Sequence, residues 1–265
     1  MKPGIVTVPI HRFEDGAGAA AQDLISVEEP LQIRLGERDI AITMRTPGNE
    51  RELAAGFLFT EGILHSRDQM ESISVDDRGT VTIHPNKTAI IDWESAPRNF
   101  YVTSSCGVCG KASIDALRAT GCTALPKGWP QVETETLASL PAKLRSSQAV
   151  FEHTGGLHAA GLFAVDGALL EIREDVGRHN AVDKLIGWAL LESRLPLDQH
   201  ILMLSGRISF ELVQKALMAK IPVIAAIGAP SSLAVETARR FGITLVGFLR
   251  DEHFNVYSEP SRIRA

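Results

Sequence analysis

From residue 178 to residue 249 the sequence alternates between segments with helical spacing of apolar residues and short runs that are apolar throughout. Continuous apolar runs of strand length are typical of parallel strands in a sheet that helices cover on both faces. The pattern therefore predicts a layered α/β domain in the C-terminal part of the chain. Its predicted elements are a helix at 178–193, a strand at 201–204, a helix at 209–219, a strand at 223–227, a helix at 231–241 and a strand at 243–249.

The N-terminal part is richer in strand patterns. Alternating apolar residues around Gly36 predict a hairpin over 31–44, and helical spacing predicts a helix over 50–64. Residues 1–25 are polar and rich in Gly and Ala, so we expect a loose arm there. The dipeptide Asp166–Gly167 between two apolar runs predicts a further hairpin. The remaining predictions are strands at 73–75, 80–84, 88–91, 100–103, 157–165 and 168–173, and helices at 111–119 and 137–145.

These patterns divide the chain into two parts. At 265 residues it can form one large domain or two smaller ones, each with its own core. We expect a β-rich N-terminal subdomain with one helix over 1–103 and a layered α/β core domain over 104–265.

Composition limits the partners of the chain. The net charge of −5 argues against broad binding to nucleic acid, and no segment has the roughly 20 apolar residues that cross a bilayer. Only 3 cysteines are present, and we find no signal-peptide pattern. We therefore expect a soluble cytoplasmic protein, in which paired cysteines are reactive or metal-binding rather than structural.

The chemically most informative segment is Ser104–Gly110, which reads SSCGVCG and places Cys106 and Cys109 two residues apart. It follows a predicted strand and precedes a predicted helix, whose N-terminus would stabilise a thiolate. Such a pair can serve dithiol redox exchange, half of a zinc site, or carriage of sulfur as a persulfide. Two small buried side chains would be the non-functional alternative.

Each alternative kind of thiol site requires a sequence feature that this chain lacks. A zinc site needs about four ligands, and the chain has no second CxxC and no HxxxH. A zinc deaminase needs a glutamate two residues after its histidine, where this chain has Ala160 after His158. Thioredoxin-like motifs occur early in a small domain, whereas this one lies beyond residue 100. A dithiol oxidoreductase nevertheless stays open as the alternative, as does a non-catalytic chaperone.

Three loops in the C-terminal part have the residues of a phosphate site. Arg178 and His179 stand at a predicted helix N-terminus, Gly206 and Arg207 follow the strand at 201–204, and glycine and serines follow the strand at 223–227. Helix N-termini and arginines bind phosphate, and ligands of open α/β sheets lie at the carboxyl ends of the strands. No Walker or GxGxxG sequence is present. The loops therefore favour a large phosphate-bearing ligand over simple ATP or NAD.

Taken together, these segments resemble the formate dehydrogenase accessory sulfurtransferase family, often called FdhD. The motifs that carry the resemblance run in family order and are TPG at 46–48, ELAAGFL at 52–58, EGI at 61–63, SCGVCG at 105–110, TGGLHAA at 154–160, EDVGRHNAVDK at 174–184, SGR at 205–207, SSLAV at 231–235 and GITLVGF at 242–248.

The resemblance implies a function. Members accept sulfur from a cysteine desulfurase as a persulfide and pass it to the molybdenum cofactor, bis-molybdopterin guanine dinucleotide, for formate dehydrogenase. It implies Cys106 as the persulfide carrier and Cys109 as its partner in transfer.

The resemblance also implies a fold and a cofactor-binding region. The implied fold is a three-layer α/β/α core similar to cytidine deaminase, assembled as a homodimer, with no bound zinc. The implied cofactor-binding region is the stretch Phe248, Leu249, Arg250, Asp251 and Glu252, beside Gly206, Arg207, Arg178 and His179.

Overall fold

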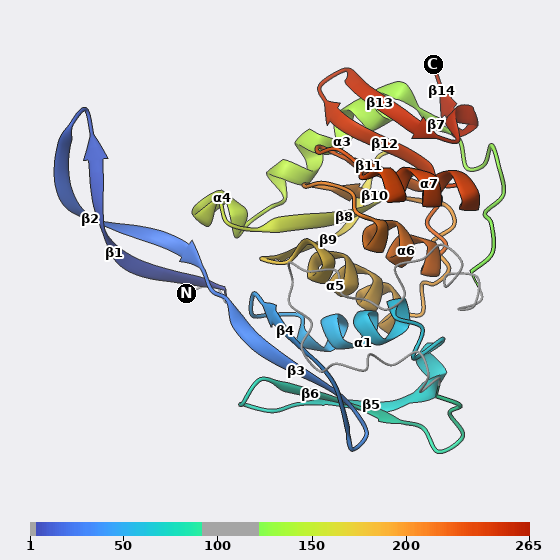
Figure 1. Ribbon diagram of the computed structural model, residues 1–265, viewed down its shortest axis with the longest axis horizontal. Helices are drawn as coiled ribbons and strands as arrows, with labels where there is room; N and C mark the ends of the chain where they lie inside the picture. The colour runs from blue at the N-terminus through green and yellow to red at the C-terminus, as the bar shows by residue number, and fades with distance from the viewer. Residues whose placement is uncertain (1–3, 92–121) are drawn as a thin grey trace.

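The computed structural model describes residues 4–91 and 122–265. Its centre is a six-stranded mixed sheet with the strand order β13-β12-β11-β10-β8-β9 (Figure 1). The strands are β8 (His158–Ala164), β9 (Leu169–Asp175), β10 (His200–Leu204), β11 (Val223–Ala226), β12 (Thr244–Arg250) and β13 (His253–Ser258).

The predicted parallel strands form the middle of this sheet. β10, β11 and β12 are parallel, as expected, while the hairpins β8–β9 and β12–β13 flank them with antiparallel pairing. The hairpin around Asp166–Gly167 is confirmed as β8–β9. The last strand of this sheet, β13, was not predicted, because only one of its six residues is buried and the segment has no apolar run.

Helices cover both faces of the sheet and produce the expected three α/β/α layers. The helices are α3 (Thr134–Ser146), α5 (Arg178–Leu191), α6 (Phe210–Met218) and α7 (Ser232–Phe241). Helix α3 packs on one face, in a core that includes Phe163 and Met203. The others pack on the opposite face, in a core that includes Leu202 and Ile224. Similarity to cytidine deaminase remains a prediction.

Helix α1 (Glu50–Thr60) adds a further layer by crossing α5. The two helices touch through glycines. A Cβ on Gly187 would lie 1.8 Å from the backbone oxygen of Glu52, and a Cβ on Gly56 would lie 1.9 Å from that of Asp183. Only glycine permits this approach, which buries the whole of α1 from Leu53 to Thr60.

The N-terminal sheet lies on the other side of α1, with the order β4-β3-β6-β5. The hairpin over 31–44 and the strands near 73–75 and 80–84 are confirmed; the strands are β3 (Glu29–Leu35), β4 (Arg38–Arg45), β5 (Met70–Val75) and β6 (Thr80–Pro85). The strand predicted at 88–91 is wrong, because Asn86 closes a turn by accepting from the backbone N–H of Thr88 at 2.8 Å.

One apolar cluster joins this sheet, α1 and α5 without interruption, from Leu31 to Leu245. The boundary predicted between residues 103 and 104 lies outside the described residues, as do the predicted elements at 100–103 and 111–119.

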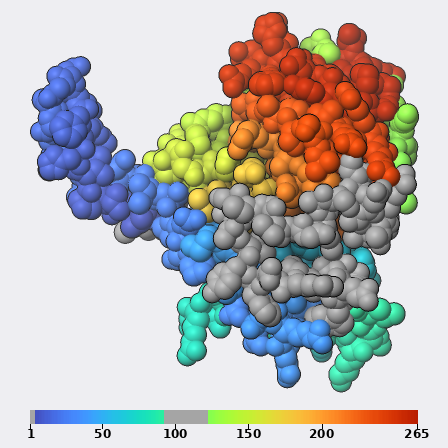
Figure 2. Space-filling view, viewed as in Figure 1, coloured from blue at the N-terminus to red at the C-terminus, as the bar shows by residue number. Residues whose placement is uncertain are grey.

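Residues 5–26 do not form the expected loose arm. β1 (Ile5–Glu14) and β2 (Ala17–Ser26) form a two-stranded hairpin that extends away from the body (Figures 1 and 2). Phe13 covers Gly18 across the hairpin, so a Cβ there would lie 2.7 Å from the ring. Sequence patterning missed the hairpin because neither of its faces is buried.

Short elements complete the fold. They are the turns of helix η1 (Arg67–Gln69), α4 (Phe151–Thr154) and η2 (Pro260–Arg262), and the paired strands β7 (Val132–Glu133) and β14 (Ile263–Arg264). Across residues 4–91 and 122–265, none of the helices has the length and apolarity needed to span a bilayer.

Candidate functional site

The predicted ligand loops meet at one edge of the central sheet. The carboxyl ends of β10, β11 and β12 lead into this edge, as the parallel pairing requires. The start of β8 lies there too, because Leu204 at the end of β10 pairs with Ala160. Helices α5 and α6 begin at the same edge, so their N-terminal residues lie beside the loops.

Glycines bring the loops after β10 and β11 into backbone contact. The N–H of Gly228 donates to the carbonyl of Gly206 at 3.1 Å, and the N–H of Phe248 donates to the carbonyl of Gly228 at 3.2 Å. A Cβ on Gly228 would lie 2.8 Å from the Gly206 oxygen. This chain of contacts connects Gly206 to the end of β12, so two of the predicted binding segments share one edge.

His158 lies against the Gly206 loop. A Cβ on Gly206 would lie 3.1 Å from Nδ1 of His158, and the strand is fixed here because the N–H of Ala159 donates to Oγ of Ser205 at 2.8 Å. Burial and then the charge of Arg178 lower the pKa of His158, Arg207 lowers it further, and Asp175 opposes them. His158 is therefore a neutral imidazole near pH 7, close enough to Arg178 and Arg207 for both charges to act on it.

Arg178 and Arg207 make this edge cationic. They are close enough for burial and then Arg207 to lower the pKa of Arg178, with Glu211 opposing. In the described ranges 4–91 and 122–265, neither arginine forms an ion pair, and the buried Nε of Arg178 has no hydrogen-bond partner. Two like charges without carboxylate partners are typical of an anion site.

His179 begins a polar chain through Ser209 to Glu211. Its Nε2 lies 3.1 Å from Oγ of Ser209 and 3.9 Å from Oε2 of Glu211. Burial, followed by the charges of Lys215 and Arg178, lowers the pKa of His179 to about 4. Burial would raise the pKa of Glu211, but hydrogen bonds from Ser209 and from its own backbone lower it.

These pKa shifts set the protonation states of His179 and Glu211. His179 is therefore neutral and Glu211 ionised near pH 7. The serine and glutamate were not predicted as site residues, although their Ser-x-Glu spacing at a helix start was visible.

The predicted segment 248–252 has mixed exposure. Phe248 is 44% exposed although it is a large apolar side chain, and its φ of 53° is left-handed, next to an irregularity in the β12–β13 pairing. Arg250, Asp251 and Glu252 are exposed at the turn, whereas Leu249 is fully buried in the core. All of this segment except Leu249 can therefore meet a ligand, and Phe248 is its apolar member.

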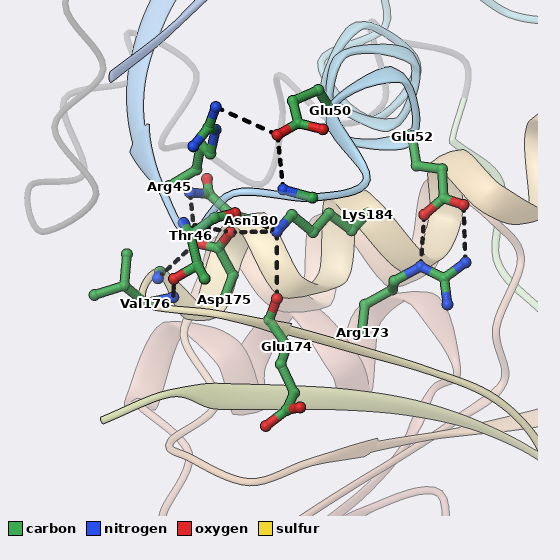
Figure 3. Close-up of polar contacts among 12 residues, drawn as sticks. Arg45, Thr46, Glu50, Glu52, Arg173, Glu174, Asp175, Val176, Asn180 and Lys184 are labelled. Atoms are coloured by element: carbon green, nitrogen blue, oxygen red, sulfur yellow. Dashed lines mark hydrogen bonds and ion pairs between the residues drawn. The ribbon is translucent and has the colours of Figure 1, made fainter. Parts of the chain in front are cut away.

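A buried polar network holds α5 in place beneath the site (Figure 3). Nζ of Lys184 lies 2.7 Å from Oδ2 of Asp175 and donates to the carbonyl of Thr46 at 2.9 Å. Asp175 also accepts from the N–H of Gly177 and from the side chain of Asn180. The network fixes the turn that presents Arg178 and His179, and it ties that turn to the end of β4.

A second buried cluster lies between α1, α5 and α6. Lys215 Nζ contacts Asp183 at 2.9 Å and Glu61 at 3.3 Å, and donates to the hydroxyl of Thr60 at 2.9 Å. Burial alone would lower the pKa of Lys215, but the two carboxylates raise it above its ordinary value. The lysine stays charged and compensated, so the cluster is structural.

The structure brings together Arg178, His179, Gly206 and Arg207, with His158, Ser209 and Glu211 added to them. Cys106 and Cys109 lie outside the described residues. The third cysteine, Cys122, is buried, with Sγ 3.4 Å from the sulfur of Met218.

The fold and this edge define a layered α/β protein with a pair of arginines at the carboxyl ends of its parallel strands. The chain belongs to the FdhD/NarQ family, whose family model matches residues 26–264. It is 52% identical to the sulfur carrier protein FdhD of Streptomyces avermitilis, over 96% of this chain and 94% of the relative. It is 46% identical to the protein of that name from Sulfolobus acidocaldarius, over 97% of each.

A solved structure agrees with the family assignment. A protein from Desulfotalea psychrophila, with a proposed role as a formate dehydrogenase accessory protein, superimposes with a TM-score of 0.80 at 27% identity. The match covers 99% of this chain and 100% of that one, so the two proteins share the fold described above.

Proposed function

We propose that the protein is a sulfur carrier that accepts persulfide sulfur from a cysteine desulfurase and transfers it to the molybdenum cofactor for formate dehydrogenase. The observation that carries the proposal is the family match, which extends over nearly the whole chain and includes the Cys106–Cys109 pair. The relatives that match at about half identity are named sulfur carrier proteins.

The chemistry would begin with the Cys106 thiolate. It attacks the outer sulfur of the desulfurase persulfide, forms a new S–S bond and releases the desulfurase cysteine as a thiolate. For release, the Cys109 thiolate attacks the inner sulfur of the Cys106 persulfide. A Cys106–Cys109 disulfide forms, and the outer sulfur leaves as hydrosulfide, taking the two electrons that the thiols lose. A cellular dithiol then restores the disulfide to thiols.

The cationic edge would hold the acceptor. The proposed acceptor is bis-molybdopterin guanine dinucleotide, a substrate that carries four phosphates. Arg178 and Arg207 supply guanidinium groups that form no ion pair with a described residue, and Gly206 permits close approach of the backbone. His179 adds no charge, and the exposed ring of Phe248 offers a flat surface to a guanine base. The polar turn Arg250–Glu252 lies next to it.

The proposed partners are a cysteine desulfurase, formate dehydrogenase and a second copy of this chain in a homodimer. The reaction requires free thiols, so we propose that it takes place in the reducing cytoplasm.

Mass spectrometry of the protein after incubation with a desulfurase and cysteine tests the proposal. We expect one added sulfur on the Cys106 peptide, no addition in Cys106→Ala, and a longer-lived persulfide in Cys109→Ala. Cys122→Ser is the matched control, because that thiol is buried in the core. Wild-type protein without added sulfur would contradict the proposal. Insulin reduction that needs both Cys106 and Cys109 equally would instead indicate a dithiol oxidoreductase.

A further inference from the structure

The imidazole of His158 is the group at the cationic edge that the sulfur-carrier chemistry leaves without a role. Neither of its ring nitrogens has a hydrogen-bond partner within the described ranges, and neither is fully buried. The ring rests on Gly206, where a Cβ would crowd Nδ1 at 3.1 Å. It is thus held in position by the fold, and no residue of the described ranges occupies either nitrogen.

His158 has four titratable neighbours, three of them charged. Arg178 on α5 and Arg207 on the β10–α6 loop disfavour its protonation, while Asp175 on β9 favours it. Asp175 is engaged by Lys184 at 2.7 Å and by Gly177 and Asn180, so it is not available to a ligand. His179 is the fourth neighbour; the two rings interact, and His179 is itself neutral.

An anion between the two arginines would change this balance. It would neutralise both of the charges that disfavour the protonated imidazole and add a negative charge close to it. A nearby opposite charge stabilises the protonated form of histidine, so the anion and the proton would bind cooperatively. Protonated imidazole would then donate a hydrogen bond to the anion.

We propose that a phosphoryl anion held by Arg178 and Arg207 also receives a hydrogen bond from His158, which takes up a proton from solvent as the anion binds. The inference rests on the proposed function, because the phosphates of the acceptor are the expected ligand. It adds a third binding residue and makes acceptor binding proton-linked.

His179 does not share this role. Its Nε2 is engaged by Ser209, and the first causes of its neutrality are burial and the buried Lys215, which an anion at the edge does not neutralise. A single proton should therefore be taken up, and it should go to His158.

Titration calorimetry with sulfate tests the proposal. Sulfate is a tetrahedral dianion that does not titrate near neutral pH, so any proton taken up goes to the protein. We expect the apparent enthalpy at pH 7 to differ between two buffers of unequal ionisation enthalpy, in the direction of proton uptake. Each unit by which binding raises the pKa of His158 should tighten sulfate binding about tenfold between high and low pH at constant ionic strength.

Three variants separate the possible results. His158→Gln should lose the proton uptake and the pH dependence, and below pH 7 it should bind sulfate more weakly than wild type. His84→Gln, on the N-terminal sheet, is the control and should keep both. The double variant Arg178→Gln/Arg207→Gln should lose sulfate binding. Proton-detected NMR of the wild-type histidines should show His158 as the ring that becomes protonated.

The outcomes distinguish this inference from the function on which it rests. Sulfate binding without proton uptake, or uptake that persists in His158→Gln, overturns the role of His158 and leaves the anion site standing. Absence of sulfate binding to wild type overturns the anion site and this inference together. Failure of persulfide formation in the desulfurase assay contradicts the sulfur-carrier function and does not affect the sulfate result.

Discussion

The glycine crossing of α1 and α5 gives the sharpest stability prediction, because local and tertiary effects have opposite signs. By helix propensity alone, Gly187→Ala in the middle of α5 would stabilise the helix by about 1 kcal/mol. In the fold, however, the new Cβ would lie 1.8 Å from the carbonyl oxygen of Glu52. An ordinary contact of this kind is at least about 3.4 Å, so α1 would have to withdraw by roughly 1.5 Å.

Neither atom at this contact belongs to a movable side chain, so a rotamer change cannot relieve it. Over-packing of a core costs about 1–3 kcal/mol and occasionally more, and this case belongs at the upper end. After the gain in propensity, we expect a net loss of about 2–3 kcal/mol in the free energy of unfolding. For a chain of this size, that corresponds to a melting temperature lower by about 5–10 °C.

Urea unfolding followed by circular dichroism measures the change. Glu236→Ala, at an exposed position of α7, is the control and should alter stability by less than about 0.5 kcal/mol. A Gly187→Ala protein as stable as wild type, or more stable, would refute the reasoning, since helix propensity would then outweigh the crossing.

Three further predictions concern buried charge and the N-terminal hairpin. The pKa of His179 is lowered from 6.5 to about 4. The stability that the neutral ring contributes is therefore complete above pH 6.5 and is lost as the pH falls towards 4. Between pH 7.5 and 4.5, His179→Asn should lose about 2.5 kcal/mol less of its free energy of unfolding than wild type, as measured by urea titrations. Lys184→Met should cost about 3–5 kcal/mol by leaving Asp175 buried without its cation, whereas Arg34→Met at an exposed pair should cost less than about 1 kcal/mol. Deletion of residues 5–25 should change the melting temperature of the body by less than about 4 °C, because the hairpin is exposed on both faces.

Each of these three predictions has an outcome that would contradict it. Equal acid sensitivity of wild type and His179→Asn would show that the ring is not neutral in the folded protein. A Lys184→Met protein of unchanged stability would mean that the network in Figure 3 does not hold α5. A large drop in melting temperature on removal of the hairpin would indicate contacts that stabilise the body.

The central elements could be predicted because their signals are local. Continuous apolar runs and helical spacing are enough to find β10 to β12 with α5 to α7, and Asp166–Gly167 marks the β8–β9 turn. The first hairpin could not be found this way, because its strands bury no face and β2 is rich in Ala and Gly. The hairpin depends on backbone hydrogen bonds, which the pattern of apolar and polar side chains does not reveal.

The candidate site could likewise be predicted only in part. Arg178, His179, Gly206 and Arg207 follow from the rule that ligands bind at the carboxyl ends of parallel strands. His158 does not follow from it, because β8 is antiparallel and reaches the edge with its N-terminal end. Only the pairing register places that residue beside Gly206, and no local signal in the sequence contains the register.

The contacts between the segment of β4 and α1 and the segment of β9 and α5 have a consequence for cooperativity. Thr46 contacts Asp175 and Lys184, Glu52 pairs with Arg173 at 2.5 Å and 2.8 Å, and α1 buries itself on α5. Any local unfolding that separates α1 from α5 also removes the contacts that support the turn before Arg178. The N-terminal sheet and the cationic edge should therefore melt in a single transition, and occupancy of the edge by an anion should protect amide hydrogens in β4 from exchange with solvent.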